Sequence, residues 1–232
     1  MKKEWIVLAF IIISLLLGIF VIYRGSLLTN ARSRQVVAFI RNPESKESLV
    51  IPAGSRCGDA PFAMPTRGMI GFIWDDSFRI GHRHTGIDIF TGTEGGVTPI
   101  YSVYDGYLSR LADWKSSVII RIPSDPLNPG RQIWTYYTHI ADPDGKTFIV
   151  DNFPPGTTDV FVPAGTLLGY QGNYSGTPGN PTGVHLHFSI IEDDGQGNFL
   201  SELAIENTLD SSTYFGMSLN AHDNPGDIPT CP

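Results

Sequence analysis

The fold of this chain is decided by one stretch of alternating residues, Gly183-Val-His-Leu-His-Phe-Ser-Ile-Ile191. Every second side chain from Val184 onward is apolar, which is the pattern of a β-strand with one face in a core. His185 and His187 then share the other face, roughly 6 to 7 Å apart, because successive side chains of a strand alternate. Two imidazoles at this spacing suit a shared metal ion, although two exposed strand histidines give the same pattern, so the choice depends on residues upstream.

Short apolar units separated by Gly, Pro and Asp fill the chain after residue 57. They lie at 68–74, 101–104, 117–122, 133–139, 148–150 and 162–172, and residues 173–182 form a loop rich in Gly, Pro, Asn and Ser. The 232 residues include 25 Gly and 17 Pro. Many short strands joined by turns predict an all-β fold of the sandwich or barrel-like type.

The net charge of −7 is distributed unevenly. Residues 1–56 carry eight Lys or Arg and three Asp or Glu, whereas residues 57–232 carry eight and twenty. Phosphate backbones repel an acidic body that has no basic stripe, so we expect no nucleic-acid partner.

The N-terminal region contains 19 uncharged residues, Trp5 to Tyr23. As a helix they extend about 28 Å, enough to cross a bilayer. Lys2 and Lys3 precede the run, and Trp5 and Tyr23 are interfacial aromatics at its ends. We predict a single-pass signal-anchor in the cell membrane, with residues 1–4 cytoplasmic and the rest extracytoplasmic; a cleaved signal peptide is the alternative.

Residues 24–56 are interpreted as a stalk or linker with one strand at 36–40, before the main domain at 57–195 and a C-terminal extension at 196–232. Four arginines of the stalk either rest on anionic lipid headgroups or are merely solvated: Arg24, Arg32, Arg34 and Arg41. The only cysteines are Cys57 and Cys231. In an oxidising compartment they would form a disulfide that ties the tail to the domain entrance.

A second candidate metal-binding segment is Ile80-Gly-His-Arg-His-Thr-Gly-Ile-Asp-Ile-Phe90. If it is extended, His84, Gly86 and Asp88 share one face, and Gly86 leaves space between the two ligating groups. His84, Asp88 and one of the later histidines make a three-ligand set with coordination positions left for water, as hydrolytic zinc sites require. His139 ends an aromatic strand, and of the six histidines only His222 lies outside these segments.

Three motifs in this order carry a family resemblance: His84-Thr-Gly-Ile-Asp88, Tyr137-Thr-His139 and His185-Leu-His187-Phe188. With the glycine-punctuated run 165–172, they resemble the lysostaphin-like (LytM-type, duplicated hybrid motif) zinc metallopeptidases over roughly residues 60–195. The resemblance implies a largely antiparallel β fold, a groove with Zn²⁺, and hydrolysis of peptide cross-links in peptidoglycan. His84, Asp88 and His187 would be ligands. His185 would act chiefly as the base and His139 as the stabilising group, or the reverse.

The sequence departs from that family in three places. Ser189 replaces the usual acidic residue after His187-Phe188, which predicts the loss of a partner to a ligand. The segments 140–161 and 173–182 are long and are expected to wall the groove. His82 is an extra histidine, interpreted as a surface residue.

Two other functions stay open at this stage. A cupin-like Fe(II) protein also combines two histidines and a carboxylate, as in His82-x-His84-xxx-Asp88. Its second motif requires a histidine shortly after a Pro-x-Gly turn, but Pro163-Ala-Gly165 is followed by Thr, Leu, Leu and Gly. A non-enzymatic scaffold or activator of other wall hydrolases is the more serious alternative. The retention of all five motif positions favours catalysis, although residues 24–56 could plug the groove of a latent enzyme.

Overall fold

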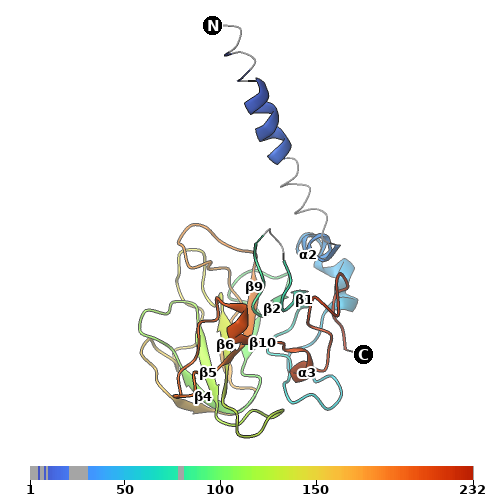
Figure 1. The fold of residues 1–232 in the computed structure, drawn as a ribbon. Helices are drawn as coiled ribbons and strands as arrows, with labels where there is room; N and C mark the ends of the chain where they lie inside the picture. Colours follow the sequence, from blue (N-terminus) through green and yellow to red (C-terminus); the bar gives the residue numbers. More distant parts are fainter. Residues whose placement is uncertain (1–4, 6–7, 9, 21–30, 78–80, 232) are drawn as a thin grey trace.

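The computed structural model describes residues 5, 8, 10–20, 31–77 and 81–231. Its main element is an eight-stranded sheet in which all named strands pair antiparallel (Figure 1). The strands are, in spatial order, β1 (Met69–Phe72), β2 (Ile87–Phe90), β9 (His185–Glu192), β6 (Ile133–Thr138), β5 (Val118–Ile122), β4 (Gly106–Ser109) and β7 (Val160–Val162), while β10 (Thr208–Leu209) pairs with β9. A second sheet pairs β3 (Pro99–Tyr101) with β8 (Leu167–Tyr170). The predicted all-β, largely antiparallel class is confirmed, with β1 and β7 as the ends of the large sheet.

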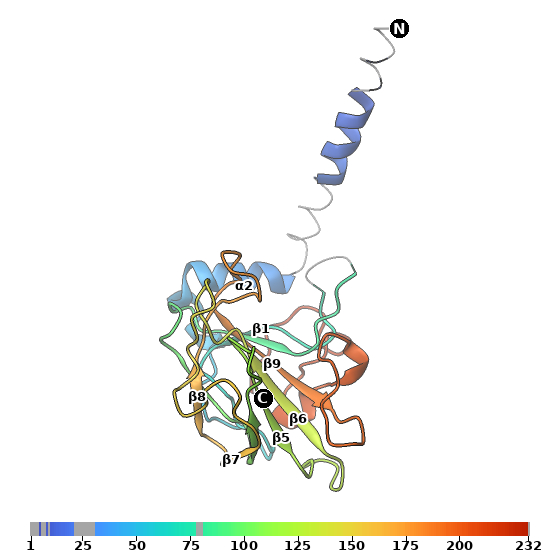
Figure 2. The ribbon, with the colours of Figure 1, turned by 90° about the vertical axis from the view of Figure 1, so that its left-hand side faces the viewer.

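Strand β9 lies between β2 and β6 in the sheet, and Figure 2 shows it beside β6. Its residues Leu186, Phe188 and Ile190 belong to the main core, together with Ile100 of β3 and Leu168 of β8. The core therefore lies between one face of the large sheet and the small sheet. The alternation predicted for residues 183–191 is confirmed, and it leaves the histidines of β9 on the opposite face.

The predicted strand at 148–150 contributes only an isolated bridge between Ile149 and Gly169. Strand β4 was not predicted, because its four residues include only two large apolar side chains. Residues 173–182 form the expected loop.

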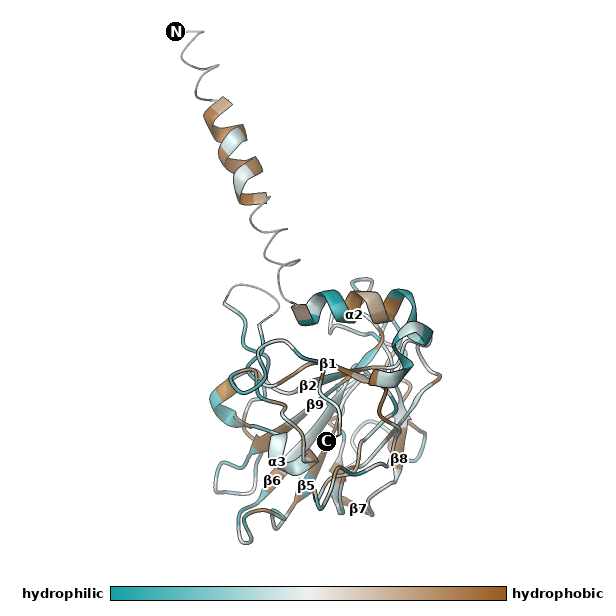
Figure 3. Cartoon of the chain, turned by 90° about the vertical axis from the view of Figure 1, so that its right-hand side faces the viewer, coloured by the Kyte–Doolittle hydropathy of each residue, from teal (hydrophilic) through white to brown (hydrophobic). Residues whose placement is uncertain are grey.

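The predicted strand at 36–40 is wrong, because these residues belong to helix α2 (Ala31–Arg41). Val36 and Phe39, one turn apart on this helix, are buried against Met69 and Phe90. A run of Val, Phe and Ile favours a strand by propensity, but the spacing of three buries one helical face, and tertiary packing decides. A 3-10 helix, Pro43–Leu49, follows. Figure 3 shows α2 across the β1 side of the domain.

Arg32 of α2 does not reach a lipid surface. Its side chain is 1% exposed, and its guanidinium lies 2.6 Å from the Asp76 carboxylate. It also donates hydrogen bonds to the backbone carbonyls of Asn224 and Asp227. The prediction of lipid contact or free solvation for this arginine is therefore wrong. Arg32 attaches α2 to the segment before β2 and to the C-terminal segment.

The C-terminal segment completes the fold. It contains the 3-10 helix Ile205–Asn207, β10 and helix α3 (Ser212–Phe215), whose Tyr214 and Phe215 enter the main core. The predicted disulfide between Cys57 and Cys231 is confirmed, with 5.2 Å between the two Cα atoms.

The predicted span at 5–23 lies partly outside the described residues, which omit 6–7, 9 and 21–23. Residues 10–20 are helical, and Figure 3 shows their mostly apolar character. Within the part of the chain that the structure describes, no helix is both long and apolar enough to span a bilayer.

Candidate metal centre

Three of the predicted site residues bring one ligand atom each to a common point. His84 Nε2 lies 3.0 Å from Asp88 Oδ1 and 3.0 Å from His187 Nδ1, and these last two atoms are 2.8 Å apart. Asp88 of β2 faces His187 of β9 directly in the strand pairing. His84 precedes β2 and is fixed by the segment before it, since its backbone pairs with Asp75 and Asp76.

The remaining ring nitrogen of each histidine also has a partner. His84 Nδ1 donates to the carbonyl oxygen of Ile73 at 3.0 Å, and His187 Nε2 lies 2.9 Å from Ser189 Oγ. Because a carbonyl only accepts, the lone pair of His84 lies at Nε2. The Ser189 hydroxyl can accept the Nε2–H of His187, which leaves the lone pair of that ring at Nδ1, and His84 Nε2 and His187 Nδ1 are the atoms that converge. The predicted loss of a partner at Ser189 is wrong: its hydroxyl shares a face of β9 with His187 and accepts the ring N–H.

Nitrogen and oxygen atoms this close need a positive charge between them, either a proton or a metal ion. Tetrahedral bonds of about 2.0 to 2.1 Å to one Zn²⁺ ion place the ligand atoms roughly 3.3 Å apart, a little wider than the observed separations. Two imidazoles and one carboxylate are also the ligand set of hydrolytic zinc sites. The residues present therefore fit Zn²⁺. His82, whose ring centroid is 6.3 Å from that of His84, is not part of the group.

Burial and mutual charge shift the pKa values of this group. Burial acts to lower the pKa of His84, but the Asp88 carboxylate outweighs it and the pKa lies above its usual value. Burial acts to raise the pKa of Asp88, but His84, His185 and His187 hold it well below its usual value. The centre thus keeps a carboxylate ready to receive a cation.

Gly86 is required for a different reason from the one predicted. A Cβ there would collide with the backbone carbonyl of Phe188 and lie 2.8 Å from Ser189 Oγ. Gly86 therefore permits the close approach of the ligand-bearing segment to β9, rather than leaving space between two ligands.

The two remaining predicted site residues lie beside the three ligands. His185 Nε2 is 3.6 Å from Asp88 Oδ1, and the rings of His139 and His185 are 4.5 Å apart. His185 Nδ1 lies 2.7 Å from the Gly183 carbonyl and His139 Nδ1 2.6 Å from that of Tyr174, so each Nε2 carries the lone pair. Phe90 stacks on His185 with 4.9 Å between centroids.

His139 adopts a left-handed backbone conformation, with φ of 69°, at the point where the chain leaves β6. Such strain in a non-glycine residue concentrates at functional sites. Burial, with His185 and His187 nearby, lowers the pKa of His139 to about 3. Burial also lowers the pKa of His185, against the opposing effect of Asp88.

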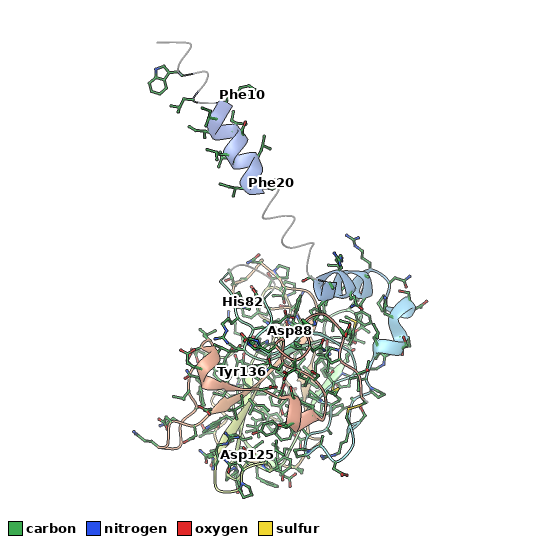
Figure 4. All side chains as sticks on the ribbon, turned by 45° about the vertical axis from the view of Figure 1, so that its right-hand side comes forward. Phe10, Phe20, His82, Asp88, Asp125 and Tyr136 are labelled. Atoms are coloured by element: carbon green, nitrogen blue, oxygen red, sulfur yellow. A yellow bond between two sulfur atoms is a disulfide. The ribbon has the colours of Figure 1, made fainter. Side chains whose placement is uncertain are left out.

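These five residues line a cleft of about 1240 Å³. Figure 4 marks Asp88, His82 and Tyr136, which all line it, whereas Asp125 lies at the far end of the domain. The loop 173–182 lines the cleft as predicted, but no residue of 140–161, all of which are described, does so. Sequence reasoning missed two further walls, one from α2 and one from residues 202–206. Neither contains a metal-binding motif that could have indicated it.

Comparisons with known proteins give partial matches. No family model matches the chain, and no curated protein matches it. Several solved structures match part of the chain. A putative glycyl-glycine endopeptidase lytM from Ruminococcus gnavus is 28% identical over 50% of this chain and 41% of its own, with a TM-score of 0.33. The catalytic domain of the prophage-encoded M23 protein EnpA from Enterococcus faecalis is 21% identical over 62% and 94%, with a TM-score of 0.38.

Over part of its length the chain resembles LytM-type peptidases. Lysostaphin is 18% identical over 59% of this chain and 46% of its own, with a TM-score of 0.34. This chain thus spans less than half the length of the lytM and lysostaphin structures.

Proposed function

We propose that this protein is a zinc metalloendopeptidase that hydrolyses peptide bonds in peptidoglycan cross-links. The observation that carries the proposal is the convergence of His84 Nε2, Asp88 Oδ1 and His187 Nδ1 within 3.0 Å, beside two further imidazoles in an open cleft. The peptidoglycan substrate is supported by the sequence resemblance to lysostaphin-like enzymes.

Bound Zn²⁺ supplies an electrophile that lowers the pKa of a water molecule and polarises the scissile carbonyl. His84, Asp88 and His187 would hold the ion. The Ile73 carbonyl keeps His84 in the required tautomer, and Ser189 Oγ is placed to accept the His187 Nε2–H when Nδ1 is a ligand. The protein thus provides a fixed ligand set with an open side toward the cleft.

The two free imidazoles handle the protons. His185 Nε2 faces the site as an acceptor and takes a proton from the attacking water. Once protonated, that nitrogen becomes a donor, and it passes the proton to the leaving amine. His139 Nε2, beside it, accepts a hydrogen bond from the second proton of the water and so holds the water in place. The ring that has taken the proton from the water can donate it in a hydrogen bond to the developing oxyanion before the proton passes to the leaving amine. Because both rings have the same tautomer, their roles can be exchanged.

The test is digestion of insoluble cell walls by the full-length protein purified in detergent. We expect soluble peptides with new amino termini from the wild type, none after a chelator removes the metal, and recovery when Zn²⁺ is added. His185→Ala should lower kcat by roughly 10² to 10⁴ and still bind Zn²⁺. His222→Ala, an exposed histidine outside the cleft, is the control.

Equal release of peptides in all samples would contradict catalysis. Stimulation of other wall hydrolases by the wild type and His185→Ala alike would favour the scaffold alternative. Iron in place of zinc in the purified protein would favour the cupin-like alternative. Four residues of the described part of 24–56 line the same cleft as the five site residues; residues 24–30 lie outside the described part.

The proposal includes a single-pass anchor at residues 5–23, with the domain outside the cytoplasm. The uncharged run supports the anchor, and the Cys57–Cys231 disulfide suits an oxidising compartment. Added protease should digest the domain in spheroplasts but not in inside-out vesicles, and the protein should resist alkaline extraction from membranes. The opposite protection pattern would reverse the orientation.

A further inference from the structure

Helix α2 supplies one wall of the cleft that contains the metal centre. Its lining residues are Ser33, Val36, Val37 and Ile40, which recur at the three- and four-residue spacing of a single helical face. The helix precedes the region that resembles a peptidase, so the family resemblance does not assign it a role.

Two side chains of this face offer aliphatic surface to the cleft. Val37 is 45% exposed and Ile40 is 47% exposed, whereas Val36 is buried in the core. Ile40 Cδ1 lies 3.6 Å from the position that a Cβ on Gly183 would occupy. The Gly183 carbonyl in turn holds His185 Nδ1 at 2.7 Å, so the aliphatic surface adjoins the proposed base.

The wall is fixed relative to the metal centre by two routes. Arg32 is paired with Asp76, whose backbone carbonyl accepts the His84 N–H at 2.8 Å. Val36 and Phe39 pack with Phe90, the ring that stacks on His185. A surface already in place binds without a cost for ordering it.

We propose that Val37 and Ile40 form an aliphatic subsite, which receives an apolar side chain of the substrate peptide next to the bond that is cut. This inference rests on the proposed function. Water leaves both aliphatic surfaces when a methyl or larger alkyl group enters, which favours such peptides over glycine-only ones at this position. The subsite acts on substrate binding and not on the proton transfers.

The test compares Val37→Thr/Ile40→Thr with the matched control Val97→Thr/Val160→Thr. The control residues are 57% and 45% exposed and lie outside the cleft. The substrates are soluble, cross-linked muropeptides released from cell walls by a muramidase. Each full-length variant is assayed in detergent. We expect KM to rise roughly tenfold in the α2 variant, with kcat, Zn²⁺ affinity and melting temperature unchanged, and no change in the control.

A second measurement does not depend on turnover. Chelator-treated protein is mixed with insoluble cell walls and sedimented, and the α2 variant should bind more weakly than the control. KM and sedimentation equal to the wild type would overturn the subsite. If the wild type cuts no peptide, the proposed function fails. The sedimentation of the α2 variant compared with that of the control then decides alone whether the subsite exists.

Discussion

At the scale of single residues, the metal centre depends on groups that are not ligands. The Ile73 carbonyl fixes the tautomer of His84, and the Ser189 hydroxyl gives His187 Nε2 a partner at 2.9 Å. Gly86 allows the two ligand-bearing segments to meet. The position and orientation of the candidate ligands therefore depend on the Ser189 hydroxyl, the Ile73 carbonyl and the absence of a side chain at Gly86.

Replacing Ser189 by alanine removes the acceptor of the His187 Nε2–H. We expect Zn²⁺ affinity to fall roughly 10- to 100-fold, measured by competition with a chromophoric chelator. Ser102→Ala is the matched control, because Ser102 is also buried and its hydroxyl donates to the Pro163 carbonyl at 2.8 Å. Equal metal affinity in Ser189→Ala and the wild type would show that the hydroxyl does not orient the ring.

Replacing Gly86 by alanine forces a Cβ against the Phe188 carbonyl. Because backbone must move, we expect the free energy of unfolding to fall by about 1–3 kcal/mol, together with zinc affinity. At Gly183, where a Cβ would find its nearest neighbours at 3.6 Å, alanine should be tolerated. Urea unfolding of the two variants measures the difference, and similar midpoints would argue against the predicted collision.

At the scale of elements, α2 is part of the domain that bears the site. Arg32 joins the helix to Asp76 on one side and to Asn224 and Asp227 on the other. The fragment that retains the site must therefore begin at or before Ala31, and not at Cys57 where the sequence places the domain start.

Arg32→Ala leaves the Asp76 carboxylate buried without its guanidinium. We expect a loss of about 3–5 kcal/mol in the free energy of unfolding and weaker Zn²⁺ binding, since Asp76 holds the His84 backbone. The control, Arg67→Ala, breaks the exposed pair with Glu47 and should cost less than about 1 kcal/mol. Unchanged zinc affinity in a folded Arg32→Ala protein would show that the attachment of α2 does not affect the metal centre.

At the scale of the whole molecule, distant segments are joined by a few buried polar groups. Asp125, fully buried in the loop after β5, accepts hydrogen bonds from Leu127 N–H, Arg131 and the Tyr214 hydroxyl of α3. Burial acts to raise the pKa of Asp125, but these donors outweigh it and the pKa lies below its usual value. The carboxylate thus connects the sheet to the C-terminal segment.

Because the folded state holds Asp125 ionised, its contribution is full above the unfolded pKa of about 3.9 and disappears as pH falls through the folded pKa. Asp125→Asn should lose about 2 kcal/mol at pH 7, and the difference from wild type should shrink below pH 4. Urea unfolding between pH 7 and pH 3 measures this. Asp113→Asn, at an exposed position, is the control. A difference that persists unchanged in acid would contradict the assignment.

The sequence predicted the features that follow from the alternation of apolar residues and from the spacing of the histidines. The alternation in 183–191 located β9 and its two faces, and the histidine motifs identified the five residues that meet. It did not predict that Arg32 would be buried, because its partners Asp76 and Asn224 are 44 and 192 residues away. Likewise, the run 36–40 favours a strand locally and becomes helical only against Met69 and Phe90.

The disulfide between Cys57 and Cys231 joins two residues that are 174 positions apart in the sequence. A protease that cuts the exposed loop 194–198 would therefore leave two pieces still covalently joined, with β9 in one and β10 in the other. A nicked molecule should migrate at full size in a gel until a reductant is added. The disulfide thus keeps β9 and β10 in one covalent molecule after such a cut.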